Sequence, residues 1–391
     1  MRNIILFSLL CPVFFLNVTG QPAIDQTDLD ALISRSKQTN SSALVVYLEG
    51  KLYYENYFGN RKQKIEAMSS TKSIVSLAIG KMLTDGLLRS VDQYVYEFYP
   101  MWNVDVKREI TIRHLMNHTS GLQNYTNTSV EIYPSKDFVR LALDAQVVEK
   151  PGTRFRYNNK AVNLLAGIVE KVSGKKLDVY LKENLFSTMG ILDFQWSKDK
   201  SGNPHGMSGF QVLPADLAKL GQLYINRGGW NGQQLIKETW FDEIVTPSAL
   251  EPTCGLLWWI IYGKRTAILD AAHIGELKQY GMPDEVLGKL EPLKGTYEDS
   301  AWRRLVTNEI INTSVWKPEY MEILQKNNVG LSRKKYDDAI GYATRGSYGN
   351  HMFVNPSKKI VVVRMITESA YTKSNDTQSD FADFFDFASS L

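Results

Sequence analysis

The chain has 391 residues, which is enough for one large hydrophobic core or for two lobes. Hydrophobic residues make up 43% of it and charged residues 22%, and both proportions are ordinary for a soluble globular protein. The formal net charge is only +3 and no basic run with interleaved aromatic residues occurs, so we expect no nucleic-acid partner and no anionic membrane surface as a partner.

The first twenty residues differ from the rest of the chain. Arg2 precedes an apolar run over residues 4–16, and small residues follow up to Gly20. This order predicts a signal peptide over residues 1–20, cleaved after Gly20, and hence an exported protein, periplasmic or secreted. The run is short for a bilayer span, so no stable membrane span is expected after cleavage; an uncleaved anchor is the alternative.

The cysteine content excludes stabilisation of the mature chain by an intrachain disulfide. Cys11 lies in the predicted signal peptide, and Cys254 is the second of the two cysteines. The mature chain, residues 21–391, therefore has no possible intrachain disulfide. No histidine or aspartate motif accompanies Cys254, so we interpret it as a structural residue. The oligomeric state is not indicated by the sequence.

Early in the mature chain, a helix is predicted over residues 21–38 and two strands over residues 43–58. A second, strongly apolar helix follows over residues 70–83, with Gly86 as its stop signal. Ser69 and Lys72 stand at the start of this helix in the pattern Ser-x-x-Lys. The free N–H groups there favour a developing anion, and Lys72, one turn on, can reach the Ser69 hydroxyl.

Ser69 and Lys72 are suited to nucleophilic catalysis. A serine hydroxyl needs a neighbouring base, and burial lowers the pKa of a lysine until its amine can act as one. The motif alone is not specific, because the chain holds four more copies, none at the start of a long apolar helix: Ser34/Lys37, Ser173/Lys176, Ser197/Lys200 and Ser332/Lys335. The alternative interpretation of Ser69 is a helix N-cap.

The middle of the chain is mostly helical. Helices are predicted after Thr111 and over four later segments, residues 137–145, 161–172, 178–189 and 216–226. His114 and His118, four apart, could bind zinc, but no glutamate stands between them and no further ligand is evident, so packing against a loop is favoured and no metal or cofactor is expected. Tyr157 and Asn159 directly precede the helix over residues 161–172, where a buried tyrosine and a helix cap are the alternative roles.

The last third returns to strands. A buried strand is predicted over residues 256–261, and residues 263–338 form a charged, helix-like block that we interpret as a helical insertion. Strands over residues 346–354 and 359–365 and a helix over residues 381–387 end the chain. The predicted fold is α/β, more strictly α+β: an antiparallel sheet flanked by helices and built from both chain ends, plus a mostly helical lobe. The interface between the lobes is the expected site.

In this combination the chain resembles the serine β-lactamase and penicillin-binding protein superfamily, and within it the class C β-lactamase, DD-peptidase and esterase branch. The resemblance covers residues 25–262 and 340–390 and rests on these segments: residues 110–122, 151–159, 216–221 and 346–356. It implies a β-lactamase/transpeptidase-like fold.

The resemblance also implies roles for individual residues. Ser69 is the expected acylated nucleophile, Lys72 its base or proton relay, and Tyr157 a second base whose phenol pKa the neighbouring ammonium lowers. Asn159 is expected to hold a substrate carbonyl or to keep Lys72 in place. The backbone N–H groups of Ser347 and Ser69 are the expected oxyanion hole.

The sequence departs from the family in its third motif. The family has Lys-Thr-Gly or a shorter variant with His-Gly on the strand beside the nucleophile, and the best match here is Ser347-Tyr348-Gly349. In β-lactamases that lysine helps to bind the drug carboxylate. Tyr348 cannot take this role, and Arg345 is the nearby alternative cation. The nylon-oligomer hydrolases are a similar branch with the shorter motif.

These observations favour an exported serine hydrolase that acts through an acyl-enzyme on a small-molecule or peptide substrate, as an esterase, amidase or peptidase. Penicillin binding, β-lactamase activity and D-amino-acid peptidase activity are alternatives. A catalytically inactive binding or sensor protein of the same fold is another. Because Ser69, Lys72, Tyr157 and Asn159 are all present, the enzyme is favoured over the sensor.

Overall fold

The computed structural model describes residues 24–374 and 380–391, so the predicted signal peptide lies outside the described residues. Among those described, six antiparallel strands form the main sheet in the order β2-β1-β14-β13-β12-β8. Their bounds are β1 Ala43–Leu48, β2 Lys51–Asn56, β8 Trp259–Tyr262, β12 Ala339–Gly346, β13 Asn350–Asn355 and β14 Ile360–Met365. The first strand pairs with the last, Ala43 opposite Met365, as the predicted sheet from both chain ends requires.

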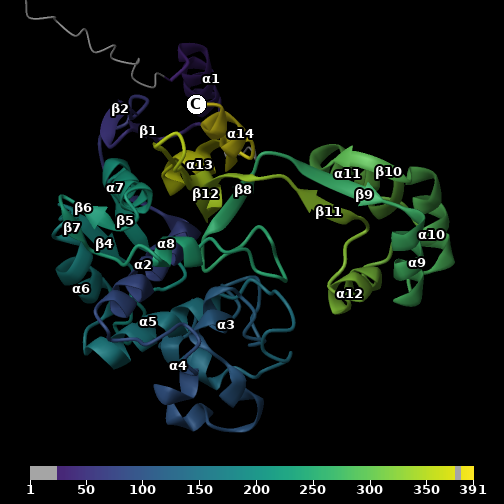
Figure 1. The fold of residues 1–391 in the computed structure, drawn as a ribbon, viewed down its shortest axis with the longest axis horizontal. Coiled ribbons are helices and arrows are strands. Elements are labelled where there is room, and N and C mark those ends of the chain that lie inside the picture. The colour runs from purple at the N-terminus through teal and green to yellow at the C-terminus, as the bar shows by residue number, and fades with distance from the viewer. Residues whose placement is uncertain (1–23, 375–379) are drawn as a thin grey trace, which may run out of the picture.

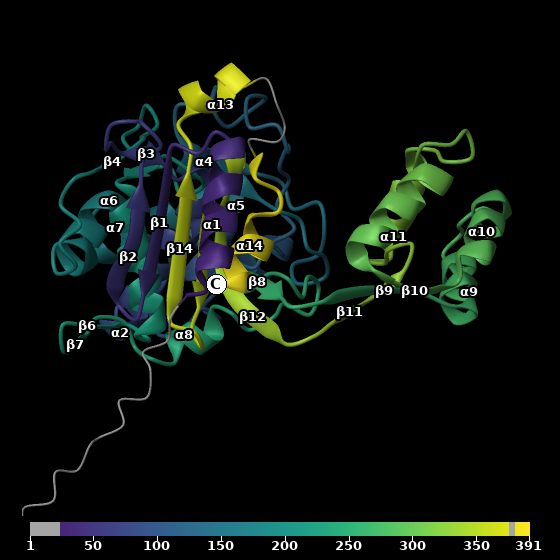
Figure 2. The same cartoon turned by 90° about the horizontal axis from the view of Figure 1, so that it is seen from above.

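Both faces of this sheet are covered. Because side chains alternate along each strand, neighbouring residues of one strand belong to different hydrophobic clusters on the two faces. Val45 and Val363 belong to the large core shared with the helical lobe and with α7 (Pro214–Ile225). Leu44 and Val362 belong to a separate cluster under two helices from opposite chain ends, α1 (Gln26–Gln38) and α14 (Phe384–Ser390). Figure 2 shows these two helices side by side in front of the strands.

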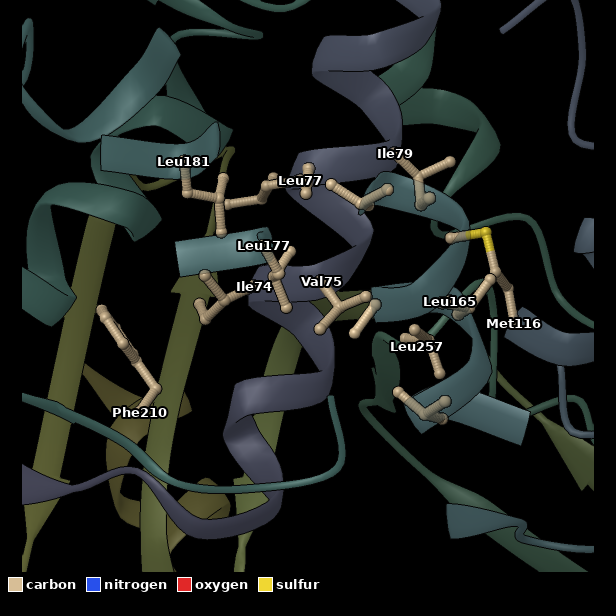
Figure 3. Close-up of a cluster of buried hydrophobic side chains, with 14 of the residues drawn as sticks. Ile74, Val75, Leu77, Ile79, Met116, Leu165, Leu177, Leu181, Phe210 and Leu257 are labelled. Carbon is tan, nitrogen blue, oxygen red and sulfur yellow. The ribbon is translucent and has the colours of Figure 1, made fainter. Parts of the chain in front are cut away.

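The helical lobe is organised around α2 (Thr71–Thr84), which is buried on nearly all sides. Figure 3 shows Ile74 and Leu77 of this helix beside Leu177 and Leu181, while Val75 faces the side of Leu165. All of these side chains belong to one core cluster. The surrounding helices are α3 Ile112–Met116, α4 Phe138–Asp144, α5 Asn159–Ser173, α6 Leu177–Leu181 and α8 Trp240–Glu243.

Residues 263–338 lie to one side of the main body and have their own hydrophobic cluster (Figure 1). This segment is not purely helical as predicted. It contains a three-stranded sheet in the order β10-β9-β11 as well as helices. The bounds are β9 Arg265–Leu269, α9 Ala271–Gln279, α10 Asp284–Leu290, β10 Gly295–Glu298, α11 Asp299–Val306, α12 Glu319–Lys326 and β11 Arg333–Tyr336. Because these strands are short and carry charged side chains on their exposed faces, the sequence does not show the alternation of apolar and polar residues that predicts a strand.

Short elements complete the described chain: β3 Ile65–Glu66, β4 Phe194–Trp196, β5 Phe210–Val212, β6 Gly229–Trp230, β7 Gln233–Gln234 and α13 Glu368–Ser374. The strand predicted over residues 256–261 is shorter, because Leu257 has a positive φ of 67° and bends the chain before β8 begins. Cys254 is buried and unpaired, and burial raises the pKa of its thiol to about 12. Within the described ranges, no helix is long and apolar enough to cross a membrane.

Candidate active site

Ser69 lies in a single 3₁₀ turn, Met68–Ser70, which connects β3 to α2. Met68 has a positive φ of 50°, a conformation that is uncommon for a residue with a side chain. The hydroxyl of Ser70 donates a hydrogen bond of 2.8 Å to the backbone carbonyl of Asn350 on β13. At the end of β12, a Cβ on Gly346 would overlap the carbonyl oxygen of Ala67. The nucleophile turn is therefore held directly against the main sheet.

Lys72 is buried and reaches Ser69, as predicted. Its amine donates hydrogen bonds of 3.1 Å to the hydroxyl of Ser69 and 2.8 Å to the backbone carbonyl of Met207. Burial lowers the pKa of Lys72 to about 7, because the charged form loses its hydration and no carboxylate compensates for it. The amine is thus available as a base near neutral pH.

Tyr157 also converges on Ser69, and its hydroxyl is hydrogen-bonded to the Ser69 side chain. Its ring lies 4.8 Å from the Lys72 amine nitrogen. The predicted lowering of the phenol pKa was wrong: burial raises the pKa of Tyr157 to about 12, and the hydrogen bond to Ser69 offsets only part of this effect. Because the lysine amine is half-neutral near pH 7, it does not supply the full positive charge on which that prediction depended.

The loop that presents Tyr157 is fixed by His118. The backbone N–H of Asn158 donates to Nδ1 of His118 at 3.2 Å, and that of Arg156 donates to the His118 carbonyl at 2.8 Å. The imidazole ring lies 4.6 Å from the Tyr157 ring. Burial, with a smaller effect of Lys72, lowers the pKa of His118 to about 3, so the ring is neutral. His118 therefore packs against a loop and hydrogen-bonds to it, as predicted. A separate finding is that the described residues contain no group of three or more His, Cys, Asp or Glu residues that could hold a metal ion.

A cleft of about 750 Å³ opens over Ser69 and is lined by Asn159, Ser347 and Tyr157 among others. Asn159 is the first residue of α5, and Asn158 caps that helix by accepting from the backbone N–H of Ala161. Among the described residues, Asn159 makes no hydrogen bond to Lys72, whose second partner is instead Met207. Asn159 thus lines the cleft without bonding to the lysine, and its role toward a substrate carbonyl stays a prediction.

The third motif lies in a turn and not on a strand as predicted. β12 ends at Gly346, and Ser347–Gly349 forms a 3₁₀ turn in which Tyr348 has a φ of 66°. Ser347 lines the cleft, but Tyr348 does not, and its ring stacks on Tyr371 with centroids 4.1 Å apart. The structure therefore brings Ser347 to the nucleophile and places Tyr348 elsewhere.

Arg345 does not line the cleft either. It pairs with His351 across the β12–β13 ladder, and its guanidinium lies 5.5 Å from the ring of Trp259 and 5.2 Å from that of Phe385 on α14. Burial lowers the pKa of Arg345. The side chain thus lies on the α14 side of the sheet and contacts Trp259, whose ring stacks on that of Tyr157 with centroids 6.5 Å apart, so its role as the cation that replaces the missing lysine stays a prediction.

Two further residues hold parts of this site in position and were not among the predicted site residues. Met207 uses its backbone carbonyl, for which the side-chain pattern gives no signal. Lys160 is almost fully buried, pairs with Glu131 at 2.8 Å and donates to the Gln123 side chain at 2.6 Å. A lysine among the apolar residues of a buried helix was the available signal, because such a charge requires a partner.

The fold and this geometry define a class: the serine hydrolases with the β-lactamase and penicillin-binding protein fold. A family model described as Beta-lactamase matches residues 29–384, and the chain belongs to this family. The predicted resemblance and fold class are thereby confirmed at the family level.

Individual relatives are distant. The chain is 23% identical over 208 residues to Protein flp of Staphylococcus aureus (strain MRSA252), covering 48% of this chain and 41% of flp. It is 24% identical over 199 residues to PbpX of Bacillus subtilis (strain 168), a provisionally assigned penicillin-binding protein, covering 50% and 49%. The matched region spans less than half the length of these curated relatives.

Solved structures show the same architecture. A Bacillus anthracis protein provisionally assigned as a 6-aminohexanoate-dimer hydrolase superposes with a TM-score of 0.63 at 17% identity, covering 92% of this chain and 81% of that one. The octameric penicillin-binding protein homologue of Pyrococcus abyssi gives 0.55 at 19% identity, covering 92% and 77%. At these identities the likeness establishes the fold.

Proposed function

We propose that this protein is an exported serine hydrolase that cleaves an ester or amide through an acyl-enzyme on Ser69. The observation that carries the proposal is the position of Lys72, buried and 3.1 Å from the Ser69 hydroxyl with a pKa lowered to about 7. A helix N-cap serine needs no such base. A neutral amine at this distance is what converts a weakly nucleophilic hydroxyl into an attacking group.

In the proposed first step, Lys72 accepts the hydroxyl proton as Oγ of Ser69 bonds to the substrate carbonyl carbon. The carbonyl oxygen becomes an oxyanion, for which the backbone N–H groups of Ser69 and Ser347 are the proposed donors. The bond to the leaving alcohol or amine then breaks, and Tyr157 passes the proton from Lys72 to it. Water next attacks the acyl carbon and gives a proton to the same pair. The bond between Oγ of Ser69 and the acyl carbon then breaks, the pair returns that proton to Oγ, and the carboxylic acid is released.

Tyr157 serves this scheme as a relay in its protonated form. A phenol with a pKa of about 12 is not a phenolate at neutral pH, but it can accept one proton while it donates another. This role is supported by the hydrogen bond between Tyr157 and the Ser69 side chain and by the distance of 4.8 Å between the Lys72 amine nitrogen and the centroid of the Tyr157 ring.

The testing experiment is intact mass spectrometry after reaction with a fluorophosphonate probe, followed by a panel of esters, amides and D-amino-acid peptides. The expected result is one adduct on the native protein, none on Ser69→Ala, and turnover of at least one substrate. Labelling of Ser69→Ala at the native rate would refute the mechanism. An adduct without turnover of any substrate in the panel supports the sensor alternative.

Export belongs to the same proposal and rests on residues 1–20 of the sequence. Expression of the full chain, followed by N-terminal sequencing of the protein recovered outside the cytoplasm, tests it. A mature N-terminus at Gln21 is expected. A product that retains Arg2 in the cytoplasm contradicts export.

A further inference from the structure

The outer wall of the cleft exposes large apolar side chains. It consists of the loop over residues 123–133, here called the wall loop, with Val148 beside it. Tyr125 is 53% exposed, Tyr133 51% and Val148 55%, and all three line the cleft above Ser69. Exposed apolar groups gathered at the mouth of a cleft mark a surface that an apolar ligand covers.

The wall loop is anchored to α5. Lys160, which directly follows Asn159 on α5, donates 2.6 Å to the Gln123 side chain and pairs with Glu131 at 2.8 Å, and these two residues lie near opposite ends of the loop. The backbone N–H of Tyr125 donates to the same Glu131 carboxylate at 3.2 Å. A buried ion pair contributes little net stability, so its effect here is to fix the position of the loop.

The residues that line the cleft carry few charges. Among the described residues that line it, Arg156 is the only charged one, and its guanidinium is paired with Glu149 at 2.8 Å. Asn124, Thr126 and Ser208 supply neutral polar groups. An ammonium on a substrate would meet no carboxylate among these residues, and the one cation, Arg156, already shares the Glu149 carboxylate with Arg154.

From these observations we infer that the wall loop selects substrates with an uncharged apolar group of about four or more carbons, which lies against Tyr125, Tyr133 and Val148. This inference rests on the proposed function and names the substrate class of that site. Lys160 is a positioning residue, since it acts through the loop and does not touch the substrate.

The test measures kcat/KM for the p-nitrophenyl esters of acetate, butyrate and hexanoate at fixed pH. Full burial of a methylene is worth about fourfold in kcat/KM. Because the wall is half exposed, each of the four additional methylenes of hexanoate contributes about twofold, so we expect hexanoate to exceed acetate on the order of fifteenfold. In the double variant Tyr125→Ser/Tyr133→Ser this ratio is expected to fall to about threefold or less. Tyr53→Ser, which removes an exposed tyrosine of β2 that does not line the cleft, is the matched control and should keep the native ratio.

Two results would overturn the inference: an unchanged hexanoate-to-acetate ratio in the double variant, or faster hydrolysis of the p-nitrophenyl ester of succinate, which carries a free carboxylate, than of butyrate. Circular dichroism melting shows whether each variant is folded. Fluorophosphonate labelling separates the two proposals. Labelled enzyme without chain-length dependence refutes only the substrate class, whereas wild type that is neither labelled nor active refutes the proposed function.

Lys160→Met tests the anchor independently of the tyrosines. Removal of the amine leaves Gln123 and Glu131 without their shared donor, so the loop is expected to loosen. We expect the KM for hexanoate to rise at least fivefold, with a smaller change in kcat, and amide hydrogen exchange to accelerate over residues 123–133. Native exchange and a native KM in this variant would show that the ion pair does not position the wall.

Discussion

The amine of Lys72 donates a hydrogen bond of 2.8 Å to the backbone carbonyl of Met207. A carbonyl accepts from an ammonium and, more weakly, from a neutral amine, so this bond orients the lysine in both of its protonation states. With Ser69 as its other partner, Lys72 has no carboxylate to retain its proton, and burial lowers its pKa to about 7. The protonation of this one amine therefore controls the proposed chemistry near neutral pH.

The first prediction is the pH profile of ester hydrolysis. Because the neutral amine is the active form, kcat/KM is expected to rise about tenfold per pH unit below the lysine pKa and to level off above pH 7. Lys72→Ala is expected to lower kcat by about 10²–10⁴ and to remove this limb of the profile. Initial rates from pH 5 to 9 on both proteins provide the measurement. A native profile with no inflection between pH 6 and 8 contradicts the assignment.

A second prediction concerns stability. In the unfolded chain Lys72 has an ordinary pKa near 10.5, so near pH 7 the folded state must release a proton that the unfolded state keeps. Native stability should therefore increase as pH rises from about 7 toward 10. Lys72→Met removes the free-energy cost of this deprotonation, so the variant should be inactive yet more stable than the native protein. Its free energy of unfolding should exceed the native value most at pH 7, and this difference should be smaller by about 2 kcal/mol at pH 9. Urea unfolding of both proteins at the two pH values measures it.

Tyr157 and Lys72 are predicted to act as one relay. Tyr157→Phe is expected to lower kcat by about 10² and Lys72→Ala by more, and the double variant should be little worse than Lys72→Ala alone. Single-turnover acylation rates for the four proteins form the cycle. If the two losses multiply instead, the residues act independently and the phenol does not lie on the path of the lysine proton.

Gly346 is predicted to be intolerant of a side chain. A Cβ there would overlap the Ala67 carbonyl and push β12 away from the nucleophile turn. Gly346→Ala should lower kcat/KM by about 10² or more and reduce stability by about 1–3 kcal/mol. Gly275→Ala is the matched control, because nothing lies within 4 Å of its Cβ and it stands inside α9. The control should retain activity and gain up to about 1 kcal/mol of stability.

The last prediction compares an antibiotic substrate with an ester. The turn after β12 presents no lysine, Tyr348 stacks on Tyr371, and Arg345 lies on the α14 side of the sheet. We therefore expect p-nitrophenyl butyrate to be hydrolysed on the order of a hundredfold faster than nitrocefin, and Arg345→Ala to leave both rates within about twofold. Nitrocefin turnover that exceeds the ester and disappears in Arg345→Ala would restore the lactamase alternative.

The sheet and the position of Ser69 and Lys72 at the start of a buried helix could be predicted because local patterns determine them. The strand pair over residues 43–58 and the apolar helix after Ser69 have clear periods, and a lysine inside that helix has to be buried. Burial is also the cause of the lowered lysine pKa, which the sequence alone therefore indicated correctly.

The remaining features depend on contacts between distant segments. Whether the pKa of Tyr157 is raised or lowered depends on how deeply the folded loop buries its hydroxyl. The charge of Lys72 depends on the same packing. The turn at Ser347 and the pairing of Lys160 with Glu131 bring together residues with no common local signal. In the insertion, four- or five-residue strands with charged exposed faces are too short to show a period.

The pairing of β1 with β14 also has a consequence for biosynthesis. A ribosome that adds about 5–20 residues per second completes β1 on the order of tens of seconds before its partner strand. During that time the edge of β1 lacks its pairing with β14, and the apolar side chain of Leu44 lacks the cover of α14. A chain that terminates before Ile360 should fail to close its sheet and be degraded, and no stable amino-terminal fragment should accumulate.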